Sequence, residues 1–132
     1  GVELTQVSYS GETSADIKQV LSALTTSAGL STWLGEATDF LAHVGIKFDI
    51  SIGGEASKTV ITALDLPKRI VFMVEAIGEF DIRVKEKKSM VIVDLVVRRA
   101  VAPADAAAWQ ASLEPTLIKL DAALKGKATD RG

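Results

Sequence analysis

The chain has 132 residues, 48% of them hydrophobic, and a formal net charge of −2 at pH 7. This length suits one domain with a single core, the hydrophobic content argues against intrinsic disorder, and the weak net charge gives no reason to expect a nucleic-acid partner. With no cysteine and one histidine, the sequence excludes disulfides, thiolate metal sites and multi-histidine metal sites within one chain.

No apolar run is long enough to span a bilayer, and no secretory signal pattern opens the sequence. We therefore expect a cytoplasmic protein with no membrane span. We also expect one domain over residues 1–132, with a flexible tail from about residue 126, and no cofactor.

The first part of the chain predicts a strand followed by two short helices. Its opening residues have the composition of a strand, which Gly11 is predicted to end. Thr13 stands three residues before Asp16, a spacing typical of a helix N-cap, and apolar residues then follow at helical spacing. Gly35 is predicted to stop the second helix. The predicted ranges are 2–9 for the strand, 13–25 for the first helix and 27–34 for the second.

From about residue 40 the apolar period changes from helical to two, which predicts a meander of antiparallel strands. Gly53 and Gly54 are a strong hairpin signal, and polar turns separate the later strands. The predicted strands cover residues 44–52, 57–64, 70–76, 80–85 and 90–98.

The last predicted element is a long helix that opens at Pro103 and contains Pro115, which should kink it. An apolar stripe at helical spacing gives this helix a face that can cover a sheet. Together the elements predict an α+β fold, in which a curved antiparallel sheet wraps around the C-terminal helix and two short helices follow the first strand. The stripe consists of Trp109, Leu113, Thr116, Leu117, Leu120 and Leu124.

Four groups of residues, in this order along the chain, carry a family resemblance. They are Leu30, Trp33, Leu34 and Gly35; Gly45 and Phe48; Pro67, Arg69, Ile70, Val71 and Phe72; and Trp109, Leu113, Leu117 and Leu120. The sequence resembles the SRPBCC superfamily of helix-grip domains, and within it the branch named for the activator of the heat-shock chaperone ATPase. The resemblance implies a deep, mostly apolar cavity between helix and sheet. It supplies no universal catalytic residue.

The resemblance and the apolar stripe together predict which residues line such a cavity. The large apolar side chains would provide contact area, and the hydroxyls would orient a ligand. Ordinary core packing would require the same stripe, so both interpretations stay open. The ligand-binding candidates are Trp33, Phe48, Phe72, Phe80, Trp109, Ser112, Leu113, Thr116 and Leu117.

No catalytic or metal-binding residue is predicted. His43 is the only side chain whose ordinary pKa lies near neutrality, but its place in a loop before a strand favours an exposed or merely hydrogen-bonded histidine. The basic cluster at residues 83–88 is typical of a solvated hairpin tip. Glu36, Asp39 and Glu75 would serve as acids or bases only if they faced inward.

Two predicted strands are apolar on both faces, so Val71, Met73, Ile92 and Val96 would point away from the helix. This pattern predicts a homodimer or another protein partner on the outer face of the sheet. The favoured function is the binding of a hydrophobic or amphipathic small molecule between helix and sheet. The alternatives are a protein-interaction module in stress response, as in the chaperone activators, and a cyclase or dehydratase acting in the cavity.

Overall fold

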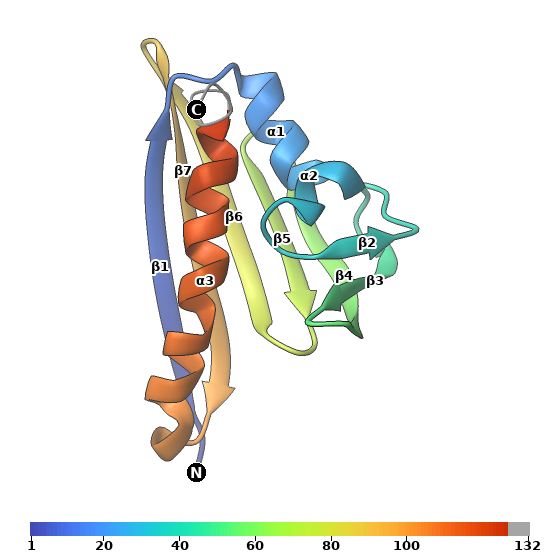
Figure 1. Ribbon diagram of the computed structural model, residues 1–132, viewed down its shortest axis with the longest axis vertical. Coiled ribbons are helices and arrows are strands. Elements are labelled where there is room, and N and C mark those ends of the chain that lie inside the picture. Colours follow the sequence, from blue (N-terminus) through green and yellow to red (C-terminus); the bar gives the residue numbers. More distant parts are fainter. Residues whose placement is uncertain (127–132) are drawn as a thin grey trace.

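The computed structural model describes residues 1–126 and contains a seven-stranded antiparallel sheet with its helices on one face (Figure 1). The strand order is β1-β7-β6-β5-β4-β3-β2, which makes β1 and β2 the two edges. The strands are β1 (Glu3–Thr13), β2 (Glu36–Thr38), β3 (Lys47–Ile52), β4 (Glu55–Asp65), β5 (Arg69–Val74), β6 (Gly78–Lys87) and β7 (Met90–Val101). The helices are α1 (Ile17–Thr25), α2 (Ser27–Ser31), the 3₁₀ turn η1 (Pro103–Asp105) and α3 (Ala106–Leu124).

The predicted α+β fold class is confirmed: the sheet faces a long C-terminal helix, and two short helices follow the first strand. The tail predicted from about residue 126 lies outside the described residues, apart from Gly126.

Period-two alternation decides which face of the sheet is buried. On β6, Phe80, Ile82 and Val84 are buried, and the Trp33 ring, from the turn after α2, lies against Phe80, so this face of the sheet carries the helices. Cross-strand pairing continues this apolar face, with Phe72 of β5 and Val97 of β7 both directly opposite Phe80. One continuous core therefore lies between the inner face and the helices.

The first strand is longer than predicted, because Gly11 does not end it. Gly11 is a buried residue of β1 that pairs with Val93 of β7. A side chain at this position would collide with the phenol ring of Tyr9. The glycine therefore makes room for an aromatic ring within the strand, and β1 continues to Thr13.

The predicted N-cap of the first helix was wrong. Asp16 caps α1, accepting a hydrogen bond from the Lys18 backbone N–H, while the Gln19 side chain accepts one from the Asp16 backbone N–H. Thr13 instead ends β1, and its hydroxyl donates to the Leu124 carbonyl oxygen at the end of α3, 2.9 Å away. The residue predicted to start a helix thus ties the first strand to the last helix.

Two other differences from the predicted elements concern a short edge strand and the proline within α3. The short strand β2 was not predicted, and it pairs with β3 at the edge of the sheet. Pro115 does not interrupt α3, which continues from Ala106 to Leu124. Pro115 is exposed, so water can satisfy the Ala111 carbonyl group that loses its helical partner.

Candidate functional site

Three aromatic rings form the centre of the inner face. The rings of Phe72 and Phe80 stack with their centroids 5.3 Å apart, and the Trp33 ring lies 6.1 Å from that of Phe80. Trp33 comes from the turn after α2, and its indole N–H donates to the Ala23 carbonyl oxygen of α1 at 2.9 Å. The three side chains are at most 2% exposed, so they form packed core.

The nine predicted ligand-binding residues separate into three groups by exposure. Trp33, Phe48, Phe72, Phe80 and Leu113 are buried in the common core. Trp109, Thr116 and Leu117 are half-buried on α3. Ser112 is exposed, and its hydroxyl donates to the Trp109 carbonyl oxygen within the same helix, 2.6 Å away.

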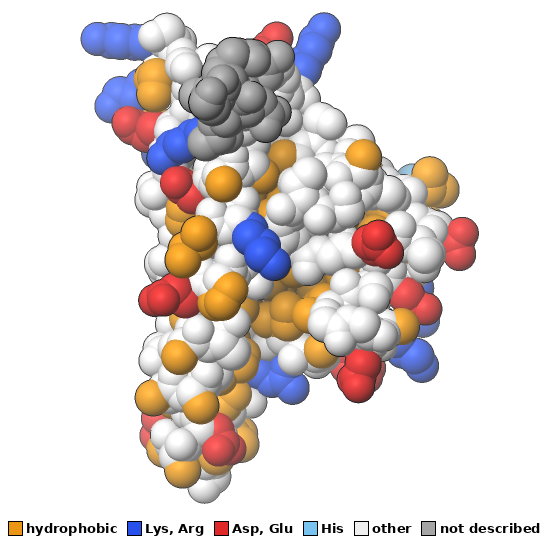
Figure 2. Space-filling model, viewed as in Figure 1, with side chains coloured by type: hydrophobic (Ala, Val, Ile, Leu, Met, Phe, Trp, Pro, Cys, Tyr) orange, Lys and Arg blue, Asp and Glu red, His pale blue; other side chains and the backbone are white. Residues whose placement is uncertain are grey.

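A hollow lined by hydrophobic side chains lies between α3 and the region of β2 (Figure 2). On the α3 side, the Trp109 indole N–H donates to the carbonyl oxygen of Ile77, in the turn between β5 and β6, at 2.9 Å. Thr116 follows Trp109 by seven residues and so shares its side of the helix. Ala37 of β2 and Ile52 of β3 are partly buried apolar residues that pack against the core. We call this hollow the inner groove.

The other side of α3 is fastened to β1. The Tyr9 hydroxyl donates to a carboxylate oxygen of Asp121 at 2.6 Å, and the Gln110 side chain donates to the Gln6 carbonyl oxygen at 3.3 Å. Burial, followed by the hydrogen bond to Asp121, raises the pKa of Tyr9 above its ordinary value. The hydrogen bond from Tyr9, with a smaller contribution from Lys125, lowers the pKa of Asp121. Tyr9 is therefore a protonated donor at neutral pH.

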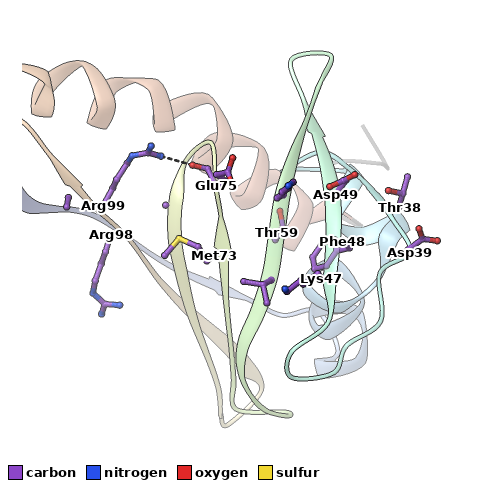
Figure 3. A pocket seen from close by; sticks show the side chains of 14 residues that line it. Thr38, Asp39, Lys47, Phe48, Asp49, Thr59, Met73, Glu75, Arg98 and Arg99 are labelled. Carbon is purple, nitrogen blue, oxygen red and sulfur yellow. Dashed lines mark hydrogen bonds between the residues drawn. The ribbon is translucent and has the colours of Figure 1, made fainter.

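A second hollow, of about 740 Å³, lies on the outer face of the sheet (Figure 3). We call it the outer hollow. Lys47, Val60 and Met73 are direct cross-strand neighbours on β3, β4 and β5 and form its middle. Because these residues alternate with buried inner-face residues, their side chains face away from the helices. A parallel row of lining residues consists of Thr38, Asp49 and Lys58.

Arginines of β7 line the other end of the outer hollow. Arg99 donates to the Glu75 carbonyl oxygen at 3.1 Å, a bond visible in Figure 3. Arg98 pairs with Glu79 at 3.0 Å. Among residues 1–126, Lys47 and Lys58 form no ion pair. The outer hollow thus combines the apolar side chains of Val60 and Met73 with charges of both signs.

A buried carboxylate next to this hollow organises the outer face. Asp81 is 5% exposed and accepts two hydrogen bonds from Arg69, at 2.9 and 3.0 Å. Arg98 contributes another at 3.3 Å, and Arg83 lies 3.7 Å away. Hydrogen bonding to Arg69 is the largest influence on Asp81 and lowers its pKa, although burial opposes the effect.

The arginines around Asp81 also explain apolar outer-face positions noted in the sequence. Val71 and Val96 are the direct cross-strand neighbours of Asp81. Val71 is 4% exposed although it faces away from the helices, whereas Met73 is 39% exposed. Arginine stems cover apolar surface while their charged ends reach the carboxylate. Of the four apolar outer-face positions noted in the sequence, Met73 is therefore the one that stays exposed.

The described residues contain few groups suited to acid–base chemistry. His43 is exposed, and its Nδ1 lies 3.0 Å from the Val44 carbonyl oxygen. Glu36, Asp39 and Glu75 are exposed as well. No three or more His, Asp or Glu side chains among residues 1–126 are placed to hold a metal ion. None of the helices in that part of the chain is both long and apolar enough to cross a membrane.

The antiparallel sheet, the long C-terminal helix and the two intervening helices define a helix-grip domain, and solved structures share this fold. Protein BH1534 from Bacillus halodurans is 21% identical, with a TM-score of 0.77 over 95% of this chain and 100% of that one. The Aha1 dimer from Colwellia psychrerythraea is 17% identical, with a TM-score of 0.69 over 92% and 96%. CalU16 from Micromonospora echinospora is 16% identical, with a TM-score of 0.70 over 96% and 84%.

No protein-family model matches the sequence, and no curated protein matches it. The similarity to solved structures therefore establishes the helix-grip fold of this chain.

Proposed function

We propose that the protein binds a hydrophobic or amphipathic small molecule at its inner groove, between α3 and the β2 edge of the sheet. The observation that carries this proposal is the hollow lined by hydrophobic side chains in Figure 2. Small-molecule sites are commonly concave and apolar, with a few polar groups that orient the ligand. Here Thr116 and the indole of Trp109 would supply those groups.

The way α3 is attached supports entry from this side. Towards β1, α3 has side-chain hydrogen bonds from Tyr9, Thr13 and Gln110. Towards the groove, the described residues contribute one, from Trp109 to Ile77. A small outward displacement of α3 on the groove side would break fewer bonds than one on the β1 side. A ligand can therefore be admitted there while β1 holds the helix.

The buried polar groups indicate the character of the ligand. Every buried side-chain nitrogen or oxygen among residues 1–126 already has a hydrogen-bond partner. A ligand that enters between α3 and the sheet would gain little binding energy from polar atoms at its inner end. The buried side chains offer no unpaired hydrogen-bond donor or acceptor to bind them. We expect an apolar body, with any polar group kept near Thr116 at the mouth.

Binding of dodecanoic acid and of the fluorescent amphiphile 1-anilinonaphthalene-8-sulfonate should test this proposal. Both should raise the melting temperature, and Thr116→Trp should weaken their binding about tenfold or more, or ~1.4 kcal/mol, by filling the groove. Ala108→Trp is the matched control, because Ala108 is exposed elsewhere on α3. Unchanged melting temperatures with both probes, or equal affinity of the two variants, would contradict the proposal.

A protein-interaction function is the second candidate, and the exposed Met73 in the outer hollow favours it. The resemblance to chaperone activators suggests the heat-shock chaperone as the partner to try first. Met73→Glu should then abolish co-purification with the chaperone and any effect on its ATPase rate, and leave the small-molecule probes bound. If Thr116→Trp weakens probe binding and Met73→Glu changes neither co-purification nor the ATPase rate, the function belongs to the inner groove.

A further inference from the structure

The two edges of the sheet differ in length. The edge strand β2 has three residues, whereas β1 has eleven and pairs with β7 in one unbroken register. Among the described residues β1 has no strand on its other side (Figure 1). A long, regular edge presents unpaired backbone N–H and C=O groups, which favour pairing with another strand.

The usual protections of an edge strand are missing from β1. It contains no lysine, arginine or proline, and its two charged residues, Glu3 and Glu12, stand near opposite ends. Leu4 is 70% exposed, and Gln6 and Ser8 are exposed on the same outer face. Proteins normally block a long edge with inserted charges, prolines or bulges. In the middle of β1, the Gln110 side chain of α3 donates to the Gln6 carbonyl oxygen at 3.3 Å, and this exposed side chain would have to move aside where a second strand pairs.

An exposed apolar side of α3 lies next to this edge. Gln110 and Asp121 bond to β1, and at 3.6 residues per turn Ile118 lies about 80° around the helix from Gln110 and about 60° from Asp121. Ile118 is 63% exposed and Ala111 is exposed as well. The β1 edge is thus flanked by Gln110 and Asp121, with the exposed Ile118 and Ala111 on the adjoining solvent side of α3.

We propose that this surface binds a second copy of the chain, with the two β1 strands paired antiparallel about a two-fold axis at Ser8. Full overlap of residues 3–13 centres on Ser8. Glu3 then faces Thr13 of the second copy, and Glu12 faces Leu4 of the second copy, so no like charges are opposed. Parallel pairing in register would instead place Glu3 opposite Glu3 of the second copy and Glu12 opposite Glu12 of the second copy. Such like-charge pairs are unfavourable.

The same axis brings the two α3 helices together. Gln110 contacts Gln6 and Asp121 contacts Tyr9, so the part of α3 level with Ser8 lies between these two residues. Ile118 lies in that part, and its apolar side chain would be covered by the second helix. Trp109 and Thr116 lie away from this surface, so the inner groove would stay open in the dimer. The dimer therefore does not depend on the function proposed for that groove.

Single-cysteine variants give a direct test, because the chain has no cysteine of its own. Residues opposed across an antiparallel pair have Cα atoms about 4.5–5.5 Å apart, within the range of a disulfide. Ser8→Cys should therefore form a covalent dimer under mild oxidation. Gln6→Cys and Ser10→Cys should form far less covalent dimer. In each variant the new cysteine faces an unchanged residue of the second copy, because position 6 pairs with position 10. Ser31→Cys, exposed on α2, is the control.

Light scattering should give a dimer mass for the unmodified chain at about 100 µM, where an interface with a micromolar Kd is almost saturated. Ser8→Lys, which opposes two like charges at the axis, and Ile118→Glu should both give monomers. Ser31→Lys should remain dimeric. A monomeric unmodified chain, a dimer unaffected by Ser8→Lys, or a dimer lost only in Met73→Glu would overturn the proposal. The last result would place self-association on the outer face.

Discussion

Replacing Trp33 with alanine is expected to lower the free energy of unfolding by about 3–5 kcal/mol. The side chain is 2% exposed, and its ring lies against Phe80 at the centre of the core. Alanine would leave a cavity there and would remove the indole donor of the buried hydrogen bond to the Ala23 carbonyl oxygen. Urea denaturation, followed by circular dichroism, would measure the loss.

Two further variants separate the ring from its hydrogen bond. Trp33→Phe keeps most of the buried ring but removes the N–H donor, so a loss of about 1–2 kcal/mol is expected. Trp109→Ala removes a tryptophan that also donates to a backbone carbonyl but is only half-buried, so its loss should be smaller than that of Trp33→Ala. A fully stable Trp33→Ala variant that no longer binds the fluorescent probe would instead make Trp33 a ligand-contacting gate.

The strand meander and the long helix could be predicted because their apolar periods are local properties of the sequence. Phe80, Ile82 and Val84 alternate with charged residues, and burial of one sheet face requires that alternation. The helical stripe at Leu113, Leu120 and Leu124 likewise corresponds to the buried side of α3. Each pattern identifies an element and its buried side from a few neighbouring positions.

Boundaries set by contacts distant in sequence could not be predicted in this way. Gly11 is typical of a strand end, and only the position of the Tyr9 ring shows why glycine is required inside β1. Thr13 has the spacing of an N-cap, but its hydroxyl bonds to Leu124, 111 positions later. In both cases tertiary packing overrode a reasonable local signal.

The candidate sites show the same limit. Sequence periodicity placed Met73 and Val71 on the outer face, but it could not show that arginines gather around Asp81 or that Val71 is buried while Met73 is exposed. The outer hollow depends on cross-strand register, which joins residues of β3, β4 and β5 into one row. Such a row has no signature in any single segment of the chain.

Asp81→Asn is expected to destabilise the protein by about 1.5–3 kcal/mol at pH 7, the range for hydrogen bonds to charged groups. The amide retains the shape of the carboxylate, but it removes the negative charge and turns an N–H₂ group towards arginine donors. The partner arginines are partly exposed and can be rehydrated, which keeps the loss below that for a fully buried pair. Asp94→Asn is the matched control, because Asp94 accepts a hydrogen bond from Ser10 and has no ion pair among residues 1–126.

The pH dependence of the Asp81→Asn effect distinguishes the charge from the shape of the side chain. Hydrogen bonds from Arg69 and Arg98 lower the pKa of Asp81 in the folded protein. A lowered carboxyl pKa stabilises the fold above the unfolded value of about 3.9, and this contribution is lost as the pH falls through the folded pKa. The stability difference between the unmodified chain and Asp81→Asn should therefore stay constant from about pH 5 to 7 and narrow below about pH 4. Asp121, whose pKa is also lowered, is present in both proteins and cancels in the comparison. A difference that persisted undiminished at pH 2 in urea titrations would show that side-chain shape, rather than charge, makes Asp81 important.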